Sequence, residues 1–566
     1  MKKFLAILLT LLMVLPVFSV MVVAEAAPDQ NAEPGSEAYT AWLKSEGYTA
    51  ISSYAELKAI TDFSATAKYY FSADITTDGV TEYALNTSTF LGTIDGNGHT
   101  LYNWKQNFVE DFGGTLRNVT FSKYVAEDST TAVVREGNGV KKNGVVSGWF
   151  LSGTLIENVV NNVEFGEVAN AIGSFAYAVC GGDNPIILRN CVNNGSFDSK
   201  YQSNNHKVGG LIGGTHNDGA TVIFENCVNN GNVRASQAGG LFGVIGNKLS
   251  VTFINCTNNG KIEATTGSTG YGISGGFIAS INNGSSIDKE VSITFENCTN
   301  TGDVLRYDAG SNTKTARQGG FMGYLINNAK TTLTIRNSTV KDCTIDGRGT
   351  NNTAEWGEAA GLVGKIKSSS AETTVTVQNC TVSNVTIEAK EGKFAFVRVA
   401  LVDTVVLENC VANNVVNANG EEVAVTQKDN DGKSVLKFTE ESEVVSINKA
   451  QQSVANADGK TAVRFIGTVN SLGFAQIGYY IELNGKTIKL TTDVVYNSLN
   501  ANYGESQITA ESLNAAFLTA VVMNDVTADF NGTINVTPFV KAEDGTYTYG
   551  KTKSISFTNG AIGECL

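Results

Sequence analysis

VIFENCVNNG, the stretch from Val222 to Gly231, recurs along the chain with small variations and decides the fold class. Its clearest copies begin at Val251 and Ile293, and a more divergent copy begins at Val375. Equivalent asparagines are separated by 29 residues at the closest and 42 at the widest. A phrase repeated at such intervals is the signature of stacked structural units. The sequence therefore predicts a repeat architecture.

Within this phrase, apolar residues alternate with polar ones, as expected for a half-buried strand. A second phrase alternates with it along the chain and reads glycine-glycine-apolar. It begins at Gly209, Gly239, Gly275 and Gly319, and in a related form at Ala360. Each repeat therefore contributes at least two short strands joined by turns.

Two all-β architectures fit a repeat of this length, a parallel β-helix and a propeller. A double glycine is also found in kelch propeller blades. However, blades of a closed propeller vary less in length than these repeats, and the four tryptophans share no common position. A β-helix tolerates a loop of any size at one turn. We therefore expect an all-β fold built on a parallel β-helix solenoid.

The recurring asparagine has a specific use in a β-helix. Asparagine tolerates the left-handed backbone conformation of a tight turn, and its side-chain amide can donate to the next coil. The cysteine that follows it would then form a second column, facing the core. The predicted structural ladder comprises Asn190, Asn226, Asn255, Asn297, Asn337, Asn379 and Asn409, with Cys191, Cys227, Cys256, Cys298, Cys380 and Cys410 beside them.

Nine cysteines in an exported chain would normally indicate disulfide bridges. Here the cysteines share one position of the repeat, where stacking places their Cβ vectors parallel, and buried free cysteine behaves as a small apolar residue. We therefore expect reduced thiols. No C-x-x-C motif is present and the three histidines share no ligand spacing with the cysteines, so we predict no metal site and no cofactor.

The ends of the chain differ from the repeats. Residues 1–26 read as a secretory signal peptide, with Lys2 and Lys3, an apolar run and an Ala-Glu-Ala box; the alternative is an uncleaved membrane anchor. Residues 27–112 form a lead-in and an N-terminal cap, helical over 37–62 with a capping box at Ser53 and Glu56. The repeats occupy 113–420, a polar linker 421–433, and a C-terminal β-sandwich 434–566.

The two phrases together resemble the GLUG-type repeats of bacterial surface proteins, and the stretch from Phe90 to Leu101 resembles the usual start of such proteins. Later coils, such as Thr334 to Val340, are similar to right-handed parallel β-helix repeats of the pectate-lyase superfamily. The C-terminal segment resembles a module on secreted proteins of gut clostridia. This resemblance implies a right-handed solenoid and an extracellular location, and it is specific for architecture rather than activity.

The remaining question is chemistry. Pectate lyases need stacked acidic residues for calcium and a basic residue, and hydrolases need paired carboxylates. Glutamates do share the position before the ladder asparagine, but alternation makes that position solvent-facing. Asp95 and His99 fall in a predicted turn, and Asp429 and Asp431 resemble only a fragment of a calcium loop. We predict no catalytic residues.

A formal charge of −14 and a pI near 4.9 disfavour nucleic acid as a partner. We also expect no membrane association after signal cleavage. The sequence thus predicts a secreted or cell-surface, non-catalytic, adhesin-like or structural protein that presents loops from a rigid β-helix. Its partner would be an extracellular ligand, either a polysaccharide or a host surface glycoprotein. The alternative is a carbohydrate-active protein, a lyase, a hydrolase or a binding module, with a divergent site.

Overall fold

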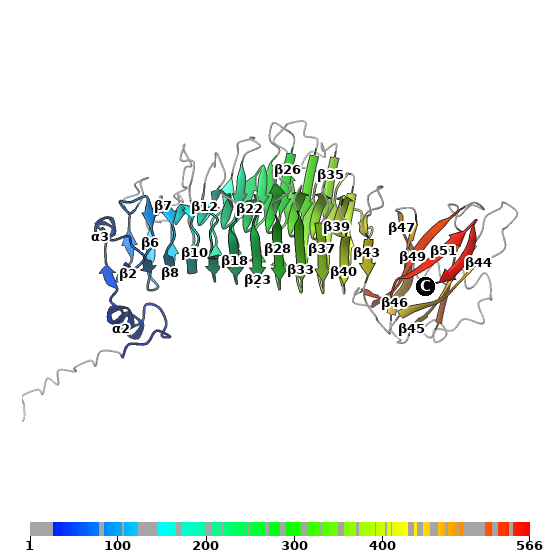
Figure 1. The fold of residues 1–566 in the computed structure, drawn as a ribbon, viewed down its shortest axis with the longest axis horizontal. Coiled ribbons are helices and arrows are strands. Elements are labelled where there is room, and N and C mark those ends of the chain that lie inside the picture. Colours follow the sequence, from blue (N-terminus) through cyan, green and yellow to red (C-terminus); the bar gives the residue numbers. More distant parts are fainter. Residues whose placement is uncertain are drawn as a thin grey trace, which may run out of the picture.

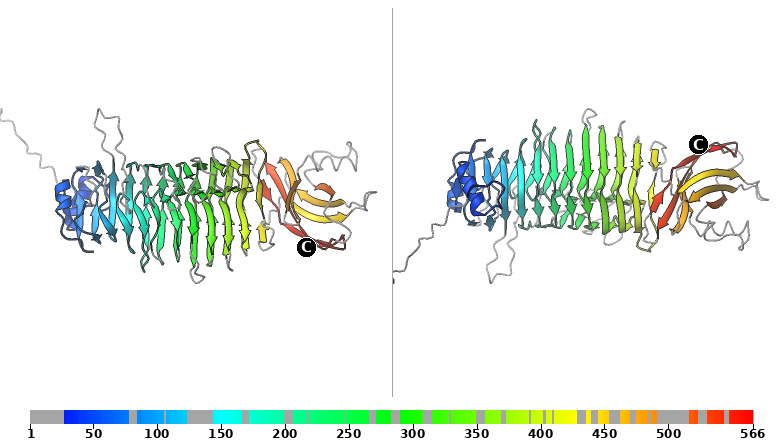
Figure 2. Two further views of the ribbon diagram at one scale, coloured as in Figure 1. Left: turned by 90° about the horizontal axis from the view of Figure 1, so that it is seen from above. Right: turned by 90° about the horizontal axis from the view of Figure 1, so that it is seen from below.

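The computed structural model shows an elongated stack of strands with a separate group of strands at its C-terminal end (Figures 1 and 2). It describes residues 27–565 apart from 78–83, 105–106, 123–143, 166–171, 199–205, 217–218, 247, 266–270, 283–289, 308–314, 328–329, 349–355, 369–372, 391, 402–403, 409, 428–434, 439–444, 453–461, 470–473, 484–485, 491–515, 523–529 and 543–546. The predicted signal peptide and the residues Asp429 and Asp431 lie outside the described residues.

One coil illustrates the repeat. It runs through β21 (Gln237–Gly239), β22 (Phe242–Ile245), β23 (Ser250–Ile254), β24 (Thr257–Asn258) and β25 (Ile262–Thr265). Each of these strands pairs in parallel with its equivalent one coil later, so β23 pairs with β28 (Val291–Glu296) from Ser250–Ser292 to Ile254–Glu296. Parallel pairing between successive repeats is the arrangement of a β-helix, and the propeller alternative is wrong.

The coils build two long parallel sheets, of 26 and 17 strands over the described residues. The first contains β1 (Thr49–Ile51), β2 (Lys68–Phe71), β3 (Ile75–Thr76), β5 (Thr93–Asp95), β6 (Thr100–Tyr102), β8 (Thr115–Phe121), β10 (Leu155–Asn161), β13 (Ile186–Arg189), β14 (Val192–Asn193), β15 (Phe197–Asp198), β18 (Thr221–Glu225), β19 (Val228–Asn229), β20 (Val233–Ala235), β23, β24, β25, β28, β29 (Thr299–Asn300), β30 (Val304–Tyr307), β33 (Thr331–Arg336), β34 (Thr339–Asp346), β37 (Thr373–Gln378), β38 (Thr381–Glu388), β40 (Thr404–Glu408), β41 (Val411–Val416) and β43 (Val435–Phe438). The second contains β4 (Thr89–Phe90), β7 (Val109–Phe112), β9 (Ser147–Phe150), β11 (Ile172–Gly173), β12 (Ala176–Val179), β16 (Lys207–Gly209), β17 (Ile212–Thr215), β21, β22, β26 (Tyr271–Gly275), β27 (Ile278–Asn282), β31 (Thr315–Gly319), β32 (Met322–Asn327), β35 (Trp356–Ala360), β36 (Val363–Ser368), β39 (Gly392–Leu401) and β42 (Ala424–Gln427).

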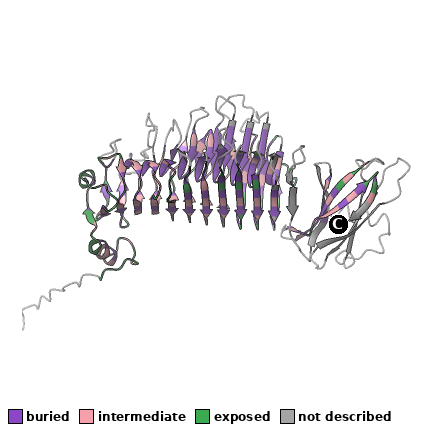
Figure 3. Ribbon diagram, in the orientation of Figure 1, coloured by how far each residue is buried: buried purple, intermediate pink, exposed green. Residues whose placement is uncertain are grey.

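The core lies inside the coils, between the two sheets (Figure 3). In the VIFENC phrase, the side chains of Val222 and Phe224 are fully buried, as their alternation predicts. The Phe224 ring stacks on that of Phe253 with centroids 4.8 Å apart, and Phe253 stacks on Phe295 at 4.9 Å. The equivalent phenylalanines of successive coils therefore form a buried stack. Such a column of aromatic rings gains favourable ring contacts in addition to burial.

The glycine-glycine phrase is explained by a sharp bend between two strands of the second sheet. A Cβ atom on Gly240 would overlap the carbonyl oxygen of Gly276 and lie 2.6 Å from Asn258 Oδ1, on the opposite side of the coil. A Cβ atom on Gly239 would overlap the carbonyl oxygen of Phe242, across the bend. This coil is therefore too narrow at the bend for a Cβ atom at either glycine, whereas three coils later Ala360 occupies the position equivalent to Gly239.

The N-terminal segment is less helical than expected. In place of one helical region over 37–62, α2 (Glu37–Ser45) and α3 (Tyr54–Lys58) flank β1, which pairs with β2. Gly47, with a φ of +80°, turns the chain after α2. Ser53 begins α3, its hydroxyl accepting from the Glu56 N–H at 3.2 Å, while the Glu56 carboxylate accepts from Ser52.

The C-terminal segment contains two antiparallel sheets. One has β44 (Val445–Gln452), β45 (Ala462–Val469) and β48 (Ala516–Val522), and the other has β46 (Phe474–Leu483), β47 (Lys486–Leu490), β49 (Gly532–Ala542), β50 (Tyr547–Tyr549), β51 (Lys553–Thr558) and β52 (Ala561–Cys565). The sequence favours a strand over Tyr547 to Phe557, and the chain there pairs with β49 in two stretches, β50 and β51, which run in the same direction and are separated by residues 550–552. The sequence also favours a short helix from Thr509, and that segment lies outside the described residues.

Candidate functional site

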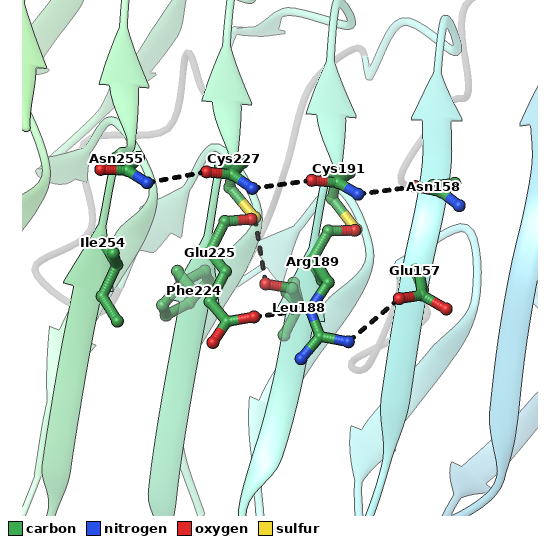
Figure 4. Close-up of polar contacts among 12 residues, drawn as sticks. Glu157, Asn158, Leu188, Arg189, Cys191, Phe224, Glu225, Cys227, Ile254 and Asn255 are labelled. Atoms are coloured by element: carbon green, nitrogen blue, oxygen red, sulfur yellow. Dashed lines mark hydrogen bonds and ion pairs between the residues drawn. The ribbon is translucent and has the colours of Figure 1, made fainter.

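The asparagines that end the strand phrase lie at equivalent turns of successive coils. From Asn118 to Asn379 their φ angles fall between 51° and 55°, the left-handed region that asparagine tolerates better than other non-glycine residues. Asn226 Nδ2 donates to Asn190 Oδ1 at 3.0 Å, and Asn255 Nδ2 donates to Asn226 Oδ1 at 3.1 Å (Figure 4). We call this column the outer asparagine ladder.

The outer ladder begins earlier than the sequence indicated. Asn158 donates to Asn118 and Asn190 donates to Asn158 in the same way, at 3.0 and 2.8 Å. Asn379 donates to Asn337 at 3.0 Å, and Asn297 has the same backbone conformation, with a φ of 54°. Asn409 lies outside the described residues.

The cysteines after these asparagines form a column inside the core. Cys227 Sγ donates to the carbonyl oxygen of Leu188, on the preceding coil, at 3.3 Å (Figure 4). The same cross-coil contact joins Cys191 to Ile156 and Cys410 to Val377, both at 3.4 Å. The described cysteines are buried, free thiols: Cys180, Cys191, Cys227, Cys256, Cys298, Cys343, Cys380 and Cys410. On the coil between Cys298 and Cys380, Ser338 stands in this column.

Burial changes the acidity of several of these thiols. It raises the pKa of Cys227 and of Cys256 well above the ordinary range, and it raises the pKa of Cys343 to about 12. Cys380 is an exception, because a hydrogen bond with Cys410 lowers its pKa. A thiol held neutral in an apolar core is neither a nucleophile nor a good metal ligand. Cys227 and Cys256 therefore act as packing residues.

A second ladder, which was not among the sequence-based expectations, lies inside the coils. Asn193 Nδ2 donates to Asn229 Oδ1 and to the Gly195 carbonyl oxygen, both at 2.8 Å. None of its members has exposed surface. Asn161, Asn229 and Asn258 repeat both contacts, while Asn300, at the end, donates to the Gly302 carbonyl oxygen and to Cys343 Sγ. This inner asparagine ladder comprises Asn161, Asn193, Asn229, Asn258 and Asn300. The sequence does indicate this ladder. The first asparagine of N-N-G lies two positions after the buried cysteine, so the alternation of side chains along the strand places it on the buried face.

The second asparagine of N-N-G forms a third ladder, exposed to solvent. Asn194 donates to Asn162, Asn230 to Asn194 and Asn259 to Asn230, at 2.7 to 2.8 Å. Thr301 continues the column by donating its hydroxyl to Asn259 Oδ1 at 2.8 Å. Nearly every residue of the recurring C-x-N-N-G phrase is therefore bonded to the coil before or after it.

Charged residues stand at most of the positions before the outer ladder, where a row of catalytic carboxylates would have to lie, while Ile254 and Gln378 stand there on two coils. Arg189 lies between two glutamates of adjacent coils, 3.1 Å from Glu157 Oε1 and 2.5 Å from Glu225 Oε2 (Figure 4). Farther along, Arg336 pairs with Glu296 at 2.8 Å. These side chains are half-buried to exposed, so the pairs each contribute little to stability. Their arrangement is a surface row of ion pairs.

Asp95 is the last residue of β5, where the predicted turn begins, and its Oδ1 accepts from the Asn97 N–H at 2.8 Å. Its side chain is fully buried. Its carboxylate accepts from the Tyr39 hydroxyl at 2.8 Å and from Arg117 Nε at 2.6 Å. Asn118, the first residue of the outer ladder, donates to both Asp95 and Tyr39. Burial, and then the Asp95 carboxylate, raises the pKa of Tyr39 above its ordinary value. Asp95 thus joins α2 to the first coils.

His99 makes a separate and more exposed contact. Its Nδ1 lies 3.1 Å from Asp74 Oδ1, and the same carboxylate oxygen accepts from the Thr100 N–H at 2.9 Å. Asp95 and His99 therefore have different partners, and the structure does not bring them together as an acid–base pair.

One buried carboxylate outside the repeat phrases gathers several cations. Glu358, on β35, has Lys365 Nζ at 2.6 Å and Arg398 at 3.2 Å from Oε1, with Arg317 at 3.4 Å from Oε2. The Arg317 guanidinium also lies over the Tyr324 ring, 3.8 Å from its centroid. Burial lowers the pKa of Lys365. No pattern in the sequence pointed to this cluster, because its members come from three coils and belong to no recurring phrase.

A metal site and a membrane-spanning helix each place requirements on the described residues. Over the described residues, histidine, cysteine, aspartate and glutamate side chains form no group of three that could hold a metal ion. In the same part of the chain, every helix is too short or too polar to span a bilayer.

Comparison with known proteins adds little to this. No protein-family model matches the chain, and no curated protein is significantly similar to it. The chain is similar to a solved structure described as "Crystal structure of a putative immunoglobulin A1 protease from Bacteroides ovatus", with 16% sequence identity and a TM-score of 0.34. The similarity covers 50% of this chain and 84% of that one. At this TM-score the likeness carries no conclusion about activity, and the chain stands as an all-β protein with long parallel sheets.

Proposed function

We propose that this chain is a secreted or cell-surface, non-catalytic protein of the adhesin-like or structural kind, in which a rigid solenoid presents loops to an extracellular ligand. The observation that carries this proposal is the use of the recurring polar residues. The amides of all three asparagine ladders, the thiols and the glutamate–arginine row are bonded between coils. The recurring polar residues therefore stiffen the solenoid. Any ligand-binding or catalytic groups must lie outside the repeated phrases.

We also propose that the repeats are of the GLUG type and wind as a right-handed β-helix, that α2 and α3 cap its N-terminal end, and that the two antiparallel C-terminal sheets form a sandwich. Export is supported by the basic and apolar N-terminus with its Ala-Glu-Ala box. The acidic charge supports a soluble extracellular protein. The partner that we propose is a polysaccharide or a host surface glycoprotein.

The test is a binding screen with residues 27–566 on a panel of glycans and of extracellular matrix glycoproteins, run beside an assay for released reducing ends. Binding without release of reducing ends is the expected result. Release of reducing ends would overturn the non-catalytic proposal and favour the carbohydrate-active alternative. In that case Glu358→Gln and Asp95→Asn, which alter the two most buried carboxylates described above, would show whether either group is needed.

A further inference from the structure

The second C-terminal sheet has an aromatic face. Tyr480 on β46, Phe539 on β49, and Tyr547 and Tyr549 on β50 are all buried. Their rings contact one another, with centroids 5.0 Å apart for Tyr480 and Phe539 and 5.3 Å for Phe539 and Tyr547. Since side chains alternate along a strand, these residues share one face of the sheet.

The opposite face of the same sheet is buried too. Tyr479 and Ile481 on β46, and Ile534 and Val536 on β49, have no exposed surface. Ile481 pairs directly with Val536, so these four residues share the other face. An antiparallel sheet that buried only one face would leave the other polar and wet. This sheet therefore needs a separate partner for its aromatic face.

That partner is the end of the coil stack. The four aromatic residues belong to the same continuous apolar cluster as the solenoid core, including Leu407, Cys410 and Val415. Strand β50 contacts β41, and β47 contacts β42, so the sheet lies across the last coils (Figure 1). The solenoid core thus continues directly into the C-terminal sheet.

Polar contacts fix the sheet in this position. Glu422, in the segment between β41 and β42, accepts from the Tyr547 hydroxyl at 2.6 Å and from Lys541 Nζ at 2.9 Å. The same segment is folded by Asn417, whose side chain accepts from the N–H groups of Asn419 and Glu421. The contact therefore joins residues 125 positions apart in the chain, and it combines aromatic packing with charge-assisted hydrogen bonds.

We propose that the aromatic face of the C-terminal sheet is an intramolecular docking surface that closes the C-terminal end of the solenoid and keeps a second copy of the chain from stacking there. An open end of a parallel stack presents unpaired N–H and C=O groups beside apolar core residues, which is a template for another chain. Repeat arrays need a different terminal unit for this reason. The sheet supplies it, and ligands then reach the solenoid only from its sides.

The experiment compares two variants of the full mature chain. Tyr547→Ser/Tyr549→Ser alters the aromatic face, and Ile534→Ala is the control on the opposite face of the same sheet. Hydrogen exchange of the amides in β40 and β41 is measured together with light scattering over a range of protein concentrations. We expect the double variant to raise exchange in these strands by about tenfold or more and to associate with increasing concentration, while β18 and β23 are unchanged. The control should raise exchange in β49 and β51 and leave β40 and β41 protected.

Unchanged exchange in β40 and β41 of the double variant, with the protein still monomeric, would overturn the proposal. If that variant does not fold, Glu422→Gln decides, because it weakens the contacts with Tyr547 and Lys541 and leaves the aromatic rings unaltered. Faster exchange in β41 than in the unaltered protein supports the proposal, and unaltered exchange in β41 rejects it.

Discussion

Asn193 and Asn229, 36 residues apart, are hydrogen-bonded to each other at 2.8 Å inside the core, with neither side chain exposed. The buried amide of Asn193 is tolerated because its partners are complete. Its Nδ2 donates to two acceptors, and its Oδ1 accepts from Asn161 on the preceding coil and from the Gly195 N–H. An amide ladder of this kind fixes the register of coils whose loops differ in length. A slip of one residue would leave every rung without a partner.

Replacing Asn229 with leucine should therefore destabilise its coil. The change removes an acceptor from Asn193 and a donor from Asn258, and each buried group left without a partner costs about 1–3 kcal/mol. Hydrogen exchange of β18 and β19 is the suitable measurement, since repeat arrays open locally. Asn230→Ala, in the exposed ladder, is the matched control and should cost less than about 1 kcal/mol. Equal effects of the two changes would contradict a special role for the buried ladder.

Phe224→Ala should cost about 3–5 kcal/mol, the usual range for removing a fully buried phenylalanine. The ring stacks on Phe253 and makes an edge contact with Phe242, so its loss leaves a cavity lined by two further rings. Thermal unfolding and local exchange of β18 both report the loss. A near-neutral result would mean that this column does not hold the coils together.

Gly240→Ala should lower the stability of its coil by more than a change in backbone conformational preference would. The reason is that the new Cβ atom would overlap the Gly276 carbonyl oxygen. Gly214 is the matched control on the preceding coil, since a Cβ atom added there would meet only the Val244 carbonyl oxygen, at 3.4 Å. We expect Gly240→Ala to reduce the soluble yield and the protection of β21 and β22, and Gly214→Ala to change neither. Tolerance of alanine at Gly240 would show that the bend can open.

The sequence predicted those parts of the molecule that follow from a local pattern repeated many times. The alternation of Val222 and Phe224 and the turn at Asn226 need only neighbouring residues, and the repeat supplies several copies. The inner ladder was predictable by the same parity argument, because Asn193 lies two positions after Cys191 and faces the same way. By contrast, the contacts of Glu358 and of Glu422 depend on how distant coils and strands meet. No local pattern encodes such contacts.

Alkaline pH should destabilise both ends of the solenoid. Burial raises the pKa of Tyr39, Tyr480, Tyr547 and Tyr549 above the ordinary value near 10. Above that pH the unfolded chain loses these protons while the folded chain keeps them. The free energy of unfolding therefore falls as pH rises, by up to about 1.4 kcal/mol per pH unit for each such tyrosine, and is unaffected below about pH 9.

Urea unfolding between pH 7 and 11 measures this effect, with Tyr549→Phe as the informative variant. The variant should show a shallower fall above pH 10 and the same flat region below pH 9. An equally steep fall in the variant would mean that groups other than Tyr549 govern alkaline unfolding.

The thiol column leads to the last prediction. Cys227 and Cys256 are fully buried, and burial keeps their thiols protonated, so alkylating reagents should not modify them in the folded protein. Cys227→Ala should weaken the core modestly, by about 1 kcal/mol for the lost contact with the Leu188 carbonyl oxygen, and should leave ligand binding unchanged. Mass spectrometry after alkylation of the native and the denatured protein provides the measurement, with full labelling expected only after denaturation. Rapid labelling of the native protein, or a disulfide at Cys191, Cys227 or Cys256, would make the column a redox-linked element rather than a packing device.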